Sequence, residues 1–258
     1  MKITITSVSK HYVSRGRETH ALLPVDLTIQ KGEFIAFVGP SGCGKSTLLN
    51  MIAGIIQASS GHIYQDGKEV KGINTHIGYM TQMDSILPWL TVEENIALPL
   101  RLRSTPENAR QIQVKEMMQA VDLTAFATSF PSELSGGMRK RVALAQVLVY
   151  NPTVLLMDEP FGALDAQLKL LMQQRLLDIW RQNGQSIIFV THDLAEAITL
   201  AQKVVVFSGR PGHIKTIKSI DISFPRDPFK VRFLPEFQRA YEDLWAILSP
   251  EIAKGEDN

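Results

Sequence analysis

Residues 39–46, Gly-Pro-Ser-Gly-Cys-Gly-Lys-Ser, decide the fold, because they match the pattern G-x-x-x-x-G-K-[ST] and separate two segments of different periodicity. The uninterrupted apolar run 34–38 before them predicts a buried strand, and residues 45–55 predict a helix. One face of this helix is apolar and carries Leu48, Leu49, Ile52 and Ile55. A glycine-rich turn between a strand and a helix can aim backbone N–H groups at phosphate oxygens, and the positive end of the helix adds to the attraction. The sequence therefore predicts a phosphate-binding loop.

The loop residues divide into those expected to act through the backbone and those expected to act through the side chain. Backbone contacts to phosphates are expected from Gly39, Pro40, Ser41, Gly42, Cys43 and Gly44. We expect the Lys45 ammonium to reach the terminal phosphates, and the Ser46 hydroxyl to bind Mg²⁺ with Thr47 beside it. This motif by itself fits kinases, GTPases, helicases and transport ATPases alike.

Composition narrows the class of protein. The chain has 258 residues with 27 Lys and Arg against 26 Asp and Glu, a formal net charge of +1, so its overall charge predicts no nucleic-acid partner. No stretch approaches the roughly 18 uninterrupted apolar residues of a membrane span, so membrane contact is expected to go through another protein. The single cysteine, Cys43, excludes an intrachain disulfide and fits a reducing compartment.

The remaining segments alternate between strand and helix patterns. Apolar alternation before residue 30 predicts antiparallel strands, and short apolar runs at 154–157, 187–190 and 204–207 predict further strands between helices. This alternation is typical of a largely parallel sheet covered by helices. We therefore expect an α/β fold: a P-loop NTPase core of largely parallel sheet, with an N-terminal antiparallel β subdomain and a helical subdomain.

The predicted division of the chain follows from these patterns. A nucleotide-binding domain is expected over residues 1–225, with the helical subdomain inserted at about 92–150, and a C-terminal helical extension over 226–258. The prolines expected to interrupt the helical subdomain are Pro99, Pro106 and Pro131. The last helix is expected to bury one face that carries Phe237, Tyr241, Leu244, Trp245 and Leu248.

Two adjacent acids end the predicted strand at 154–157. Asp158 and Glu159 follow it directly, at the edge where α/β sheets place ligands. Successive side chains point in different directions, so Asp158 is expected to hold Mg²⁺ or its water while Glu159 faces the attacking water as its general base or as the group that positions it. The alternative, two solvated acids that cap a strand, is disfavoured by the phosphate loop in the same chain.

A second glycine pair makes the resemblance to a family specific. Residues 134–138, Leu-Ser-Gly-Gly-Met, resemble the signature motif of ABC ATPases and precede Asp158, as in that family. The resemblance implies a head-to-tail dimer in which Ser135, Gly136 and Gly137 of one subunit complete the ATP site around Lys45 of the other. A helix N-cap followed by flexible glycines is the alternative interpretation of these three residues.

Other positions resemble further motifs of the ABC ATPases, in the family's order. Gln82 resembles the Q-loop glutamine, which implies contact with magnesium and water near the permease. Asp165, after Leu164, resembles the D-loop residue that crosses the dimer interface. His192 resembles the switch histidine that contacts the γ-phosphate and orients Glu159. Tyr12 resembles the aromatic residue that stacks on adenine, although packing within a strand is the alternative. The resemblance thus implies four catalytic residues, which are Glu159, His192, Gln82 and Lys45.

The segments around residues 82–95 and 208–214 resemble the importer branch for nitrate, sulfonates, taurine and pyrimidine precursors of thiamine. The implied partners are a second ATPase subunit, identical or not, an integral membrane permease and a periplasmic or lipid-anchored substrate-binding protein. The implied location is peripheral, at the cytoplasmic face of the cell (inner) membrane. Residues 87–90, Leu-Pro-Trp-Leu, are expected to grip a permease helix, unless Trp89 and Leu90 only pack the helical subdomain.

Two other classes of protein remain to be compared. An ABC ATPase of DNA repair, translation or cluster assembly would share the nucleotide motifs, but those that act on nucleic acid would be expected to carry extra basic or coiled-coil regions. A small-molecule P-loop kinase would need an acceptor site and would not need residues 135–137.

Two details carry their own expectations. Residues 138–141, Met-Arg-Lys-Arg, and Gln146 depart from the family pattern, and we expect them to alter interface charge or cooperativity without touching the phosphate or water positions. Cys43, within the phosphate loop, is expected to be shielded from alkylation by nucleotide.

Overall fold

The chain begins with a small antiparallel sheet. The computed structural model describes residues 1–14, 16–83, 85–162 and 164–256. The sheet has the strand order β2-β1-β4-β5. Its strands are β1 (Ile3–Ser14), β2 (Arg17–Ile29), β4 (Ser60–Gln65) and β5 (Lys68–Glu69). The expected N-terminal antiparallel region is therefore present, with β1 paired to both β2 and β4.

A second, mixed sheet forms the centre of the molecule, with the order β10-β9-β3-β8-β7-β6. Its strands are β3 (Phe34–Val38), β6 (Ile77–Met80), β7 (Val154–Asp158), β8 (Ser186–Val190), β9 (Lys203–Phe207) and β10 (Ile214–Ser219). Five strands run parallel and β10 pairs antiparallel with β9. Since β3, β7 and β8 are neighbours, the loops that leave their carboxyl ends meet at one edge.

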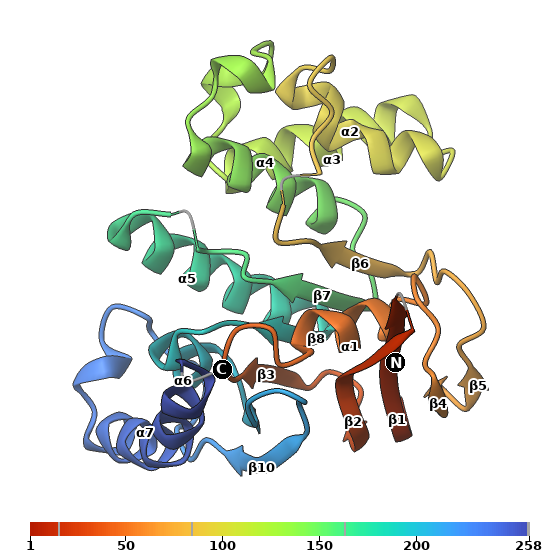
Figure 1. Cartoon of the computed structure of the whole chain (residues 1–258). Helices are drawn as coiled ribbons and strands as arrows, with labels where there is room; N and C mark the ends of the chain where they lie inside the picture. Colours follow the sequence, from red (N-terminus) through yellow and green to blue (C-terminus); the bar gives the residue numbers. More distant parts are fainter. Residues whose placement is uncertain (15, 84, 163, 257–258) are drawn as a thin grey trace.

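The helices pack in two places (Figure 1). Around the central sheet lie α1 (Lys45–Ile52), α5 (Ala166–Asn183), α6 (Leu194–Leu200) and α7 (Pro235–Glu256). A separate lobe between β6 and β7 contains α2 (Val92–Leu102), α3 (Glu107–Ala120) and α4 (Gly136–Leu148). Short 3-10 helices occur at Thr124–Phe126, Pro131–Glu133 and Val231–Phe233.

Three apolar clusters follow from this arrangement. Alternate residues of β3 face opposite sides of the sheet, as strand geometry requires. Phe34 packs in the cluster shared with α5, α6 and α7, and Phe37 in the cluster shared with α1 and the antiparallel sheet. The helical lobe has a third cluster of its own, which includes Ile96, Val114 and Val142.

The structure corrects three details of the expected helices. The first helix ends at Ile52, because Gly54 turns the chain with a φ of 73°, and Ile55 is half exposed instead of buried. Pro99 lies inside α2 and does not interrupt it, since a capping box at Thr91 and a buried face stabilise the helix. In α7, Tyr241 and Trp245 are partly exposed instead of buried.

The segment after β10 is tied to the core by a buried arginine. The Arg226 guanidinium donates to the carbonyls of Ile198 and Ala201, at the end of α6, and to that of Ile222. Leu244 and Leu248 of α7 belong to the same apolar cluster as the central sheet. The division at residue 225 stays a prediction.

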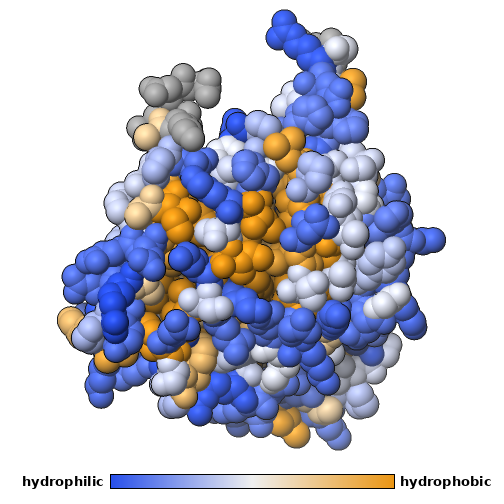
Figure 2. All heavy atoms as spheres, turned by 90° about the horizontal axis from the view of Figure 1, so that it is seen from below, coloured by the Kyte–Doolittle hydropathy of each residue, from blue (hydrophilic) through white to orange (hydrophobic). Residues whose placement is uncertain are grey.

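Figure 2 shows the molecule from the side where β10 and α7 lie in Figure 1. Apolar side chains gather in the middle of this face, within a hydrophilic border. β10 and α7 carry the partly exposed Ile217 and Trp245. Within the described ranges, every helix is too short or too polar to cross a bilayer.

Candidate active site

The phosphate loop connects β3 to α1. Gly44, at the N-cap of α1, has a φ of 96°, and a Cβ added there would lie 2.6 Å from the Ala21 carbonyl oxygen. The loop therefore needs glycine at this position for both its conformation and its close packing. The N–H groups of the first turn of α1 point back into the loop, as they do at anion-binding helix ends.

Lys45 closes over the loop that precedes it. Its Nζ donates to the carbonyls of Gly39 and Pro40, at 2.8 Å each, and the side chain is nearly buried. Its charge is thus held above the loop carbonyls, where the terminal phosphates of a nucleotide are expected. Ser46 and Thr47 follow in the first turn of α1 and are partly exposed.

Cys43 lies inside the protein. The residue is fully buried, and its Sγ lies 3.5 Å from Lys45 Nζ. The protein itself therefore already shields the thiol, and the prediction that nucleotide protects it from alkylation stays a prediction. Cys43 can still contribute its backbone N–H to the loop.

Asp158 and Ser46 come together from different elements. Asp158 ends β7, beside β8, and is only 5% exposed. Burial raises the pKa of its carboxyl, whereas a hydrogen bond from Ser46 opposes that shift. A carboxylate and a hydroxyl in contact beside Lys45 form an oxygen-rich corner of the site.

Glu159 has an unusual backbone conformation. Its φ is 50°, uncommon for a residue with a side chain, and its N–H donates to the Val190 carbonyl at 3.0 Å. Such backbone geometry occurs most often where a side chain must be aimed.

Three of the expected catalytic residues meet at the Glu159 carboxylate. His192 Nδ1 lies 3.4 Å from Glu159 Oε2. Gln82 Nε2 approaches the same oxygen at 3.5 Å. His192 follows β8 and Gln82 follows β6, on either side of β7, so the strand order of the sheet brings the three side chains together.

Lys140 contacts Gln82, which the sequence did not indicate. Its side chain is nearly buried and its Nζ donates to the Gln82 carbonyl. Arg141 donates to the carbonyls of Val121 and Asp122. Lys140 therefore holds the backbone of Gln82, whereas the expectation that residues 138–141 do not touch the phosphate or water positions stays a prediction.

The signature residues form a separate surface. Ser135 caps α4 and accepts a hydrogen bond from the Met138 N–H, while Asp165 caps α5. An added Cβ at Gly137 would meet Leu164 and Leu168, so the starts of α4 and α5 lie side by side. Among the described residues, no hydrogen bond joins Ser135, Gly136 or Gly137 to the phosphate loop of the same chain.

Two expected contact residues are exposed. Tyr12, on β1, is 46% exposed, with Lys10 Nζ 5.2 Å from its ring centroid. Trp89 is 69% exposed, so the interpretation that it only packs the helical subdomain is wrong. Both rings have area available for contact with another molecule.

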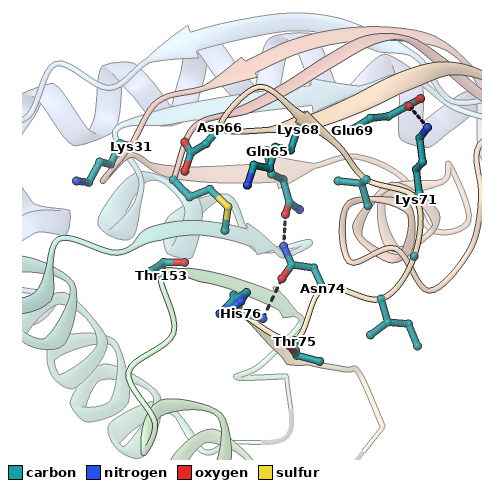
Figure 3. A pocket seen from close by; sticks show the side chains of 14 residues that line it. Lys31, Gln65, Asp66, Lys68, Glu69, Lys71, Asn74, Thr75, His76 and Thr153 are labelled. Carbon is teal, nitrogen blue, oxygen red and sulfur yellow. Dashed lines mark hydrogen bonds and ion pairs between the residues drawn. The ribbon is translucent and has the colours of Figure 1, made fainter.

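A cavity of about 670 Å³ lies elsewhere, between the β4–β5 hairpin and the segment before β6 (Figure 3). Its polar side chains bond one another: Asn74 binds Gln65, and Lys71 binds Glu69 at 3.2 Å. Since it includes His76 and Thr153, just before β6 and β7, it lies at the amino ends of these strands. The phosphate loop leaves the carboxyl end of β3, so this cavity is distinct from it.

Comparison with known proteins gives the same family as the motifs. The ABC transporter family matches residues 22–162. The aliphatic sulfonates import ATP-binding protein SsuB of Bacillus subtilis (strain 168) is 40% identical over 257 residues, which span 100% of this chain and 96% of that protein. The taurine import ATP-binding protein TauB of Rhizobium johnstonii is 42% identical over 239 residues, 90% of each chain.

A solved structure extends the agreement to the fold. The dimeric post-hydrolysis state of the ATP-binding cassette MJ0796, bound to ADP and Pi, superposes with a TM-score of 0.79 at 29% identity, covering 86% of this chain and 100% of that one. The expected α/β fold with a P-loop core is confirmed. The chain therefore belongs to the ABC transporter family, as an ATP-binding subunit that hydrolyses ATP.

Proposed function

We propose that this chain drives the uptake of a small solute by coupling ATP hydrolysis to a separate membrane permease. In this proposal two ATPase subunits act together at the cytoplasmic face of the membrane. The observation that carries it is the convergence of His192 and Gln82 on the Glu159 carboxylate, beside the corner formed by Asp158 and Ser46. That arrangement suits attack by water on a terminal phosphate.

Each side chain then has a distinct task. Glu159 accepts the proton of the attacking water, and Gln82 and His192 orient that carboxylate from two sides. Lys45 neutralises the terminal phosphates, and Tyr12 stacks on the adenine.

The donor set fits Mg²⁺. The Ser46 hydroxyl, the Asp158 carboxylate and the Gln82 amide supply oxygen ligands, which this ion prefers together with phosphate oxygens. When bound, the ion would offset the negative charge of the β- and γ-phosphates.

A head-to-tail dimer accounts for the second surface. Ser135, Gly136 and Gly137 lie beside the start of α5, where Asp165 is the N-cap. In the part of the chain that the structure describes, no hydrogen bond joins them to the phosphate loop of the same chain. In a second copy of the chain, or a related subunit, these residues would complete the site around Lys45. The dimeric state of MJ0796 supports this assembly.

A groove of about 610 Å³ is the permease surface that we propose. Its lining includes the apolar side chains of Ile55, Ile73 and Leu102, together with Tyr79 of β6. Because β6 leads directly to Gln82, pressure on the groove can reach the catalytic carboxylate through one strand. The exposed Trp89 offers a second anchor for the same permease helix.

The transported solute is proposed from the relatives. The names of SsuB and TauB specify aliphatic sulfonates and taurine. We infer a small anionic or nitrogen- or sulfur-containing solute, with nitrate and a pyrimidine precursor of thiamine as alternatives. A periplasmic or lipid-anchored binding protein would deliver it to the permease.

The direct test of the chemistry is Glu159→Gln. Gln keeps the shape of the side chain and an acceptor for His192, but it cannot take the proton. Phosphate release should fall about 10²- to 10⁴-fold, the contribution of a general base, while MgATP binding persists. Size-exclusion chromatography with MgATP should then show a stable dimer. Unchanged phosphate release would exclude Glu159 as the base, and an MgATP-loaded monomer would contradict the dimer.

A further inference from the structure

The hairpin loop between β9 and β10 packs against the phosphate loop. Residues 208–213 form a tight turn in which the Ser208 N–H donates to the His213 carbonyl, and the Ser208 hydroxyl contacts His213 Nδ1 at 2.8 Å. Gly212 lies so close to the phosphate loop that an added Cβ would be 1.7 Å from the Cys43 carbonyl oxygen. The Gly212 carbonyl also accepts from the Leu23 N–H of β2 at 2.8 Å.

Arg210, at the tip of this turn, reaches the phosphate loop with its side chain. Its Nε donates to the Gly42 carbonyl at 3.0 Å. A side chain at Gly42 would collide with the guanidinium of Arg210. The arginine therefore fits only because glycine at position 42 has no side chain. With Ala21 packed against Gly44 on the other side, the phosphate loop is held between β2 and the 208–213 turn.

The contact has a consequence for the donors of the loop. In a trans peptide the carbonyl of one residue and the N–H of the next point in opposite directions. Arg210 holds the Gly42 carbonyl on the outer side of the phosphate loop, so the Cys43 N–H points to the inner side. There it donates to the Pro40 carbonyl at 3.4 Å. That inward N–H is one of the groups expected to donate a hydrogen bond to a phosphate oxygen.

The turn is anchored in its place by the C-terminal helix. Glu251 of α7 is nearly buried, and its Oε2 accepts from the Gly209 N–H at 3.0 Å. Its Oε1 binds Lys215 of β10 at 2.6 Å. Figure 1 shows the C-terminal end of α7 at the sheet edge from which the phosphate loop leaves. Thus one carboxylate links the last helix to the residue before Arg210.

We propose that Arg210 is a positioning residue for nucleotide binding, and that Glu251 sets its position from α7. The proposal rests on the proposed role of the phosphate loop. Arg210 acts on the peptide between Gly42 and Cys43 and not on the reacting atoms. Its loss should therefore weaken nucleotide binding and leave the hydrolysis step nearly unchanged.

The experiment compares variants of the whole chain in ATP hydrolysis and in binding of MgADP. Arg210→Ala should raise the KM for ATP and the Kd for MgADP about three- to tenfold, the range for one ordinary hydrogen bond, because the contact is exposed to solvent. The kcat should stay within about twofold of the wild-type value. Added guanidinium ion should restore part of the affinity. An unchanged KM, or a fall in kcat alone, would overturn the role of Arg210.

Lys215→Ala is the matched control for Glu251→Ala. Both remove the ion pair on α7, but only Glu251→Ala removes the acceptor of the Gly209 N–H. KM should rise in Glu251→Ala and stay near wild type in Lys215→Ala. An equal rise in both would overturn the link from α7, because loss of stability alone would then explain it.

Lys45→Ala separates this inference from the function on which it rests. If Lys45→Ala abolishes nucleotide binding while Arg210→Ala has no effect, the phosphate loop keeps its role and the inference about Arg210 fails. If nucleotide binding survives in Lys45→Ala, the proposed nucleotide site itself fails.

Discussion

Glu196 is expected to fix the orientation of the His192 side chain without contacting it. The His192 side chain is 66% exposed, so few contacts of its own fix its direction toward Glu159. The residue before it is held firmly: Thr191 Oγ1 donates to Glu196 Oε2 at 2.6 Å and accepts from the Asp193 N–H. Lys169 of α5 pairs with the other oxygen of Glu196 at 2.9 Å. The turn that carries His192 is therefore held in place by side chains of two helices, α5 and α6.

The substitution Glu196→Gln removes the charge opposite Lys169 but keeps an acceptor for Thr191. Hydrogen bonds to charged groups contribute about 1.5–3 kcal/mol. Two features reduce this figure: the Lys169 side chain is 26% exposed to solvent, and it still has Asp193 as an ion-pair partner at 3.6 Å. We therefore expect the free energy of unfolding to fall by about 1–2 kcal/mol. At about 2–4 °C per kcal/mol for a chain of this size, Tm should fall by about 2–8 °C. If a similar loss reaches the transition state, kcat falls about tenfold.

Glu33→Gln is the matched control. Glu33 is 7% exposed against 5% for Glu196, and it pairs with Lys203 at 2.6 Å, but it lies before β3 at the opposite end of the sheet. Both variants should lose similar stability in thermal unfolding. Only Glu196→Gln should lose kcat in steady-state ATP hydrolysis, with KM for ATP nearly unchanged. Equal loss of kcat in both variants, or in neither, would refute the positioning of His192 by Glu196.

Three further predictions concern single side chains. Tyr12→Ala should raise the KM for ATP about tenfold and Tyr12→Phe should not, because stacking needs only the ring; equal effects in ATP titrations would exclude stacking. Asp158→Asn should raise the Mg²⁺ concentration needed for half-maximal hydrolysis, and an unchanged Mg²⁺ titration would remove Asp158 from the metal site. Burial raises the pKa of the Tyr79 hydroxyl above its ordinary value of 10.0, so its contribution to stability is full below pH 10.0 and is lost as pH rises further. Tyr79→Phe should flatten the fall in the free energy of unfolding between about pH 10 and pH 12 in urea titrations; an unchanged slope would contradict this.

The parts of the fold that follow local patterns could be predicted from the sequence. The run 34–38, the glycine-rich loop and the acids at 158–159 each depend on residues adjacent in the chain, and each lies where it was expected. The resemblance to the ABC ATPases was enough to expect Glu159, His192 and Gln82 in one site. The strand order that brings them together is known only from the structure.

Contacts between distant segments could not be predicted in this way. Lys140 binds the backbone of Gln82, 58 residues away, and Arg210 binds that of Gly42, 168 residues away. Every residue has a backbone carbonyl whatever its side chain, so the residue types at Gln82 and Gly42 do not indicate that a distant side chain binds there. The helix that begins at Lys45 was predicted too long for a related reason. Its apolar period continues to Ile55, whereas the turn at Gly54 ends it.

The central claim is that this ATPase works on a membrane permease. The most direct test is copurification of the tagged chain from gently solubilised membranes, followed by mass spectrometry of the bound proteins. A double substitution in the groove, Ile73→Glu with Leu102→Glu, serves as control, because both side chains are exposed and their loss should spare ATP hydrolysis. We predict that a polytopic membrane protein stays bound to the wild-type chain and is lost from the groove variant. Recovery of only soluble proteins or nucleic acid with the wild-type chain would contradict the transport function.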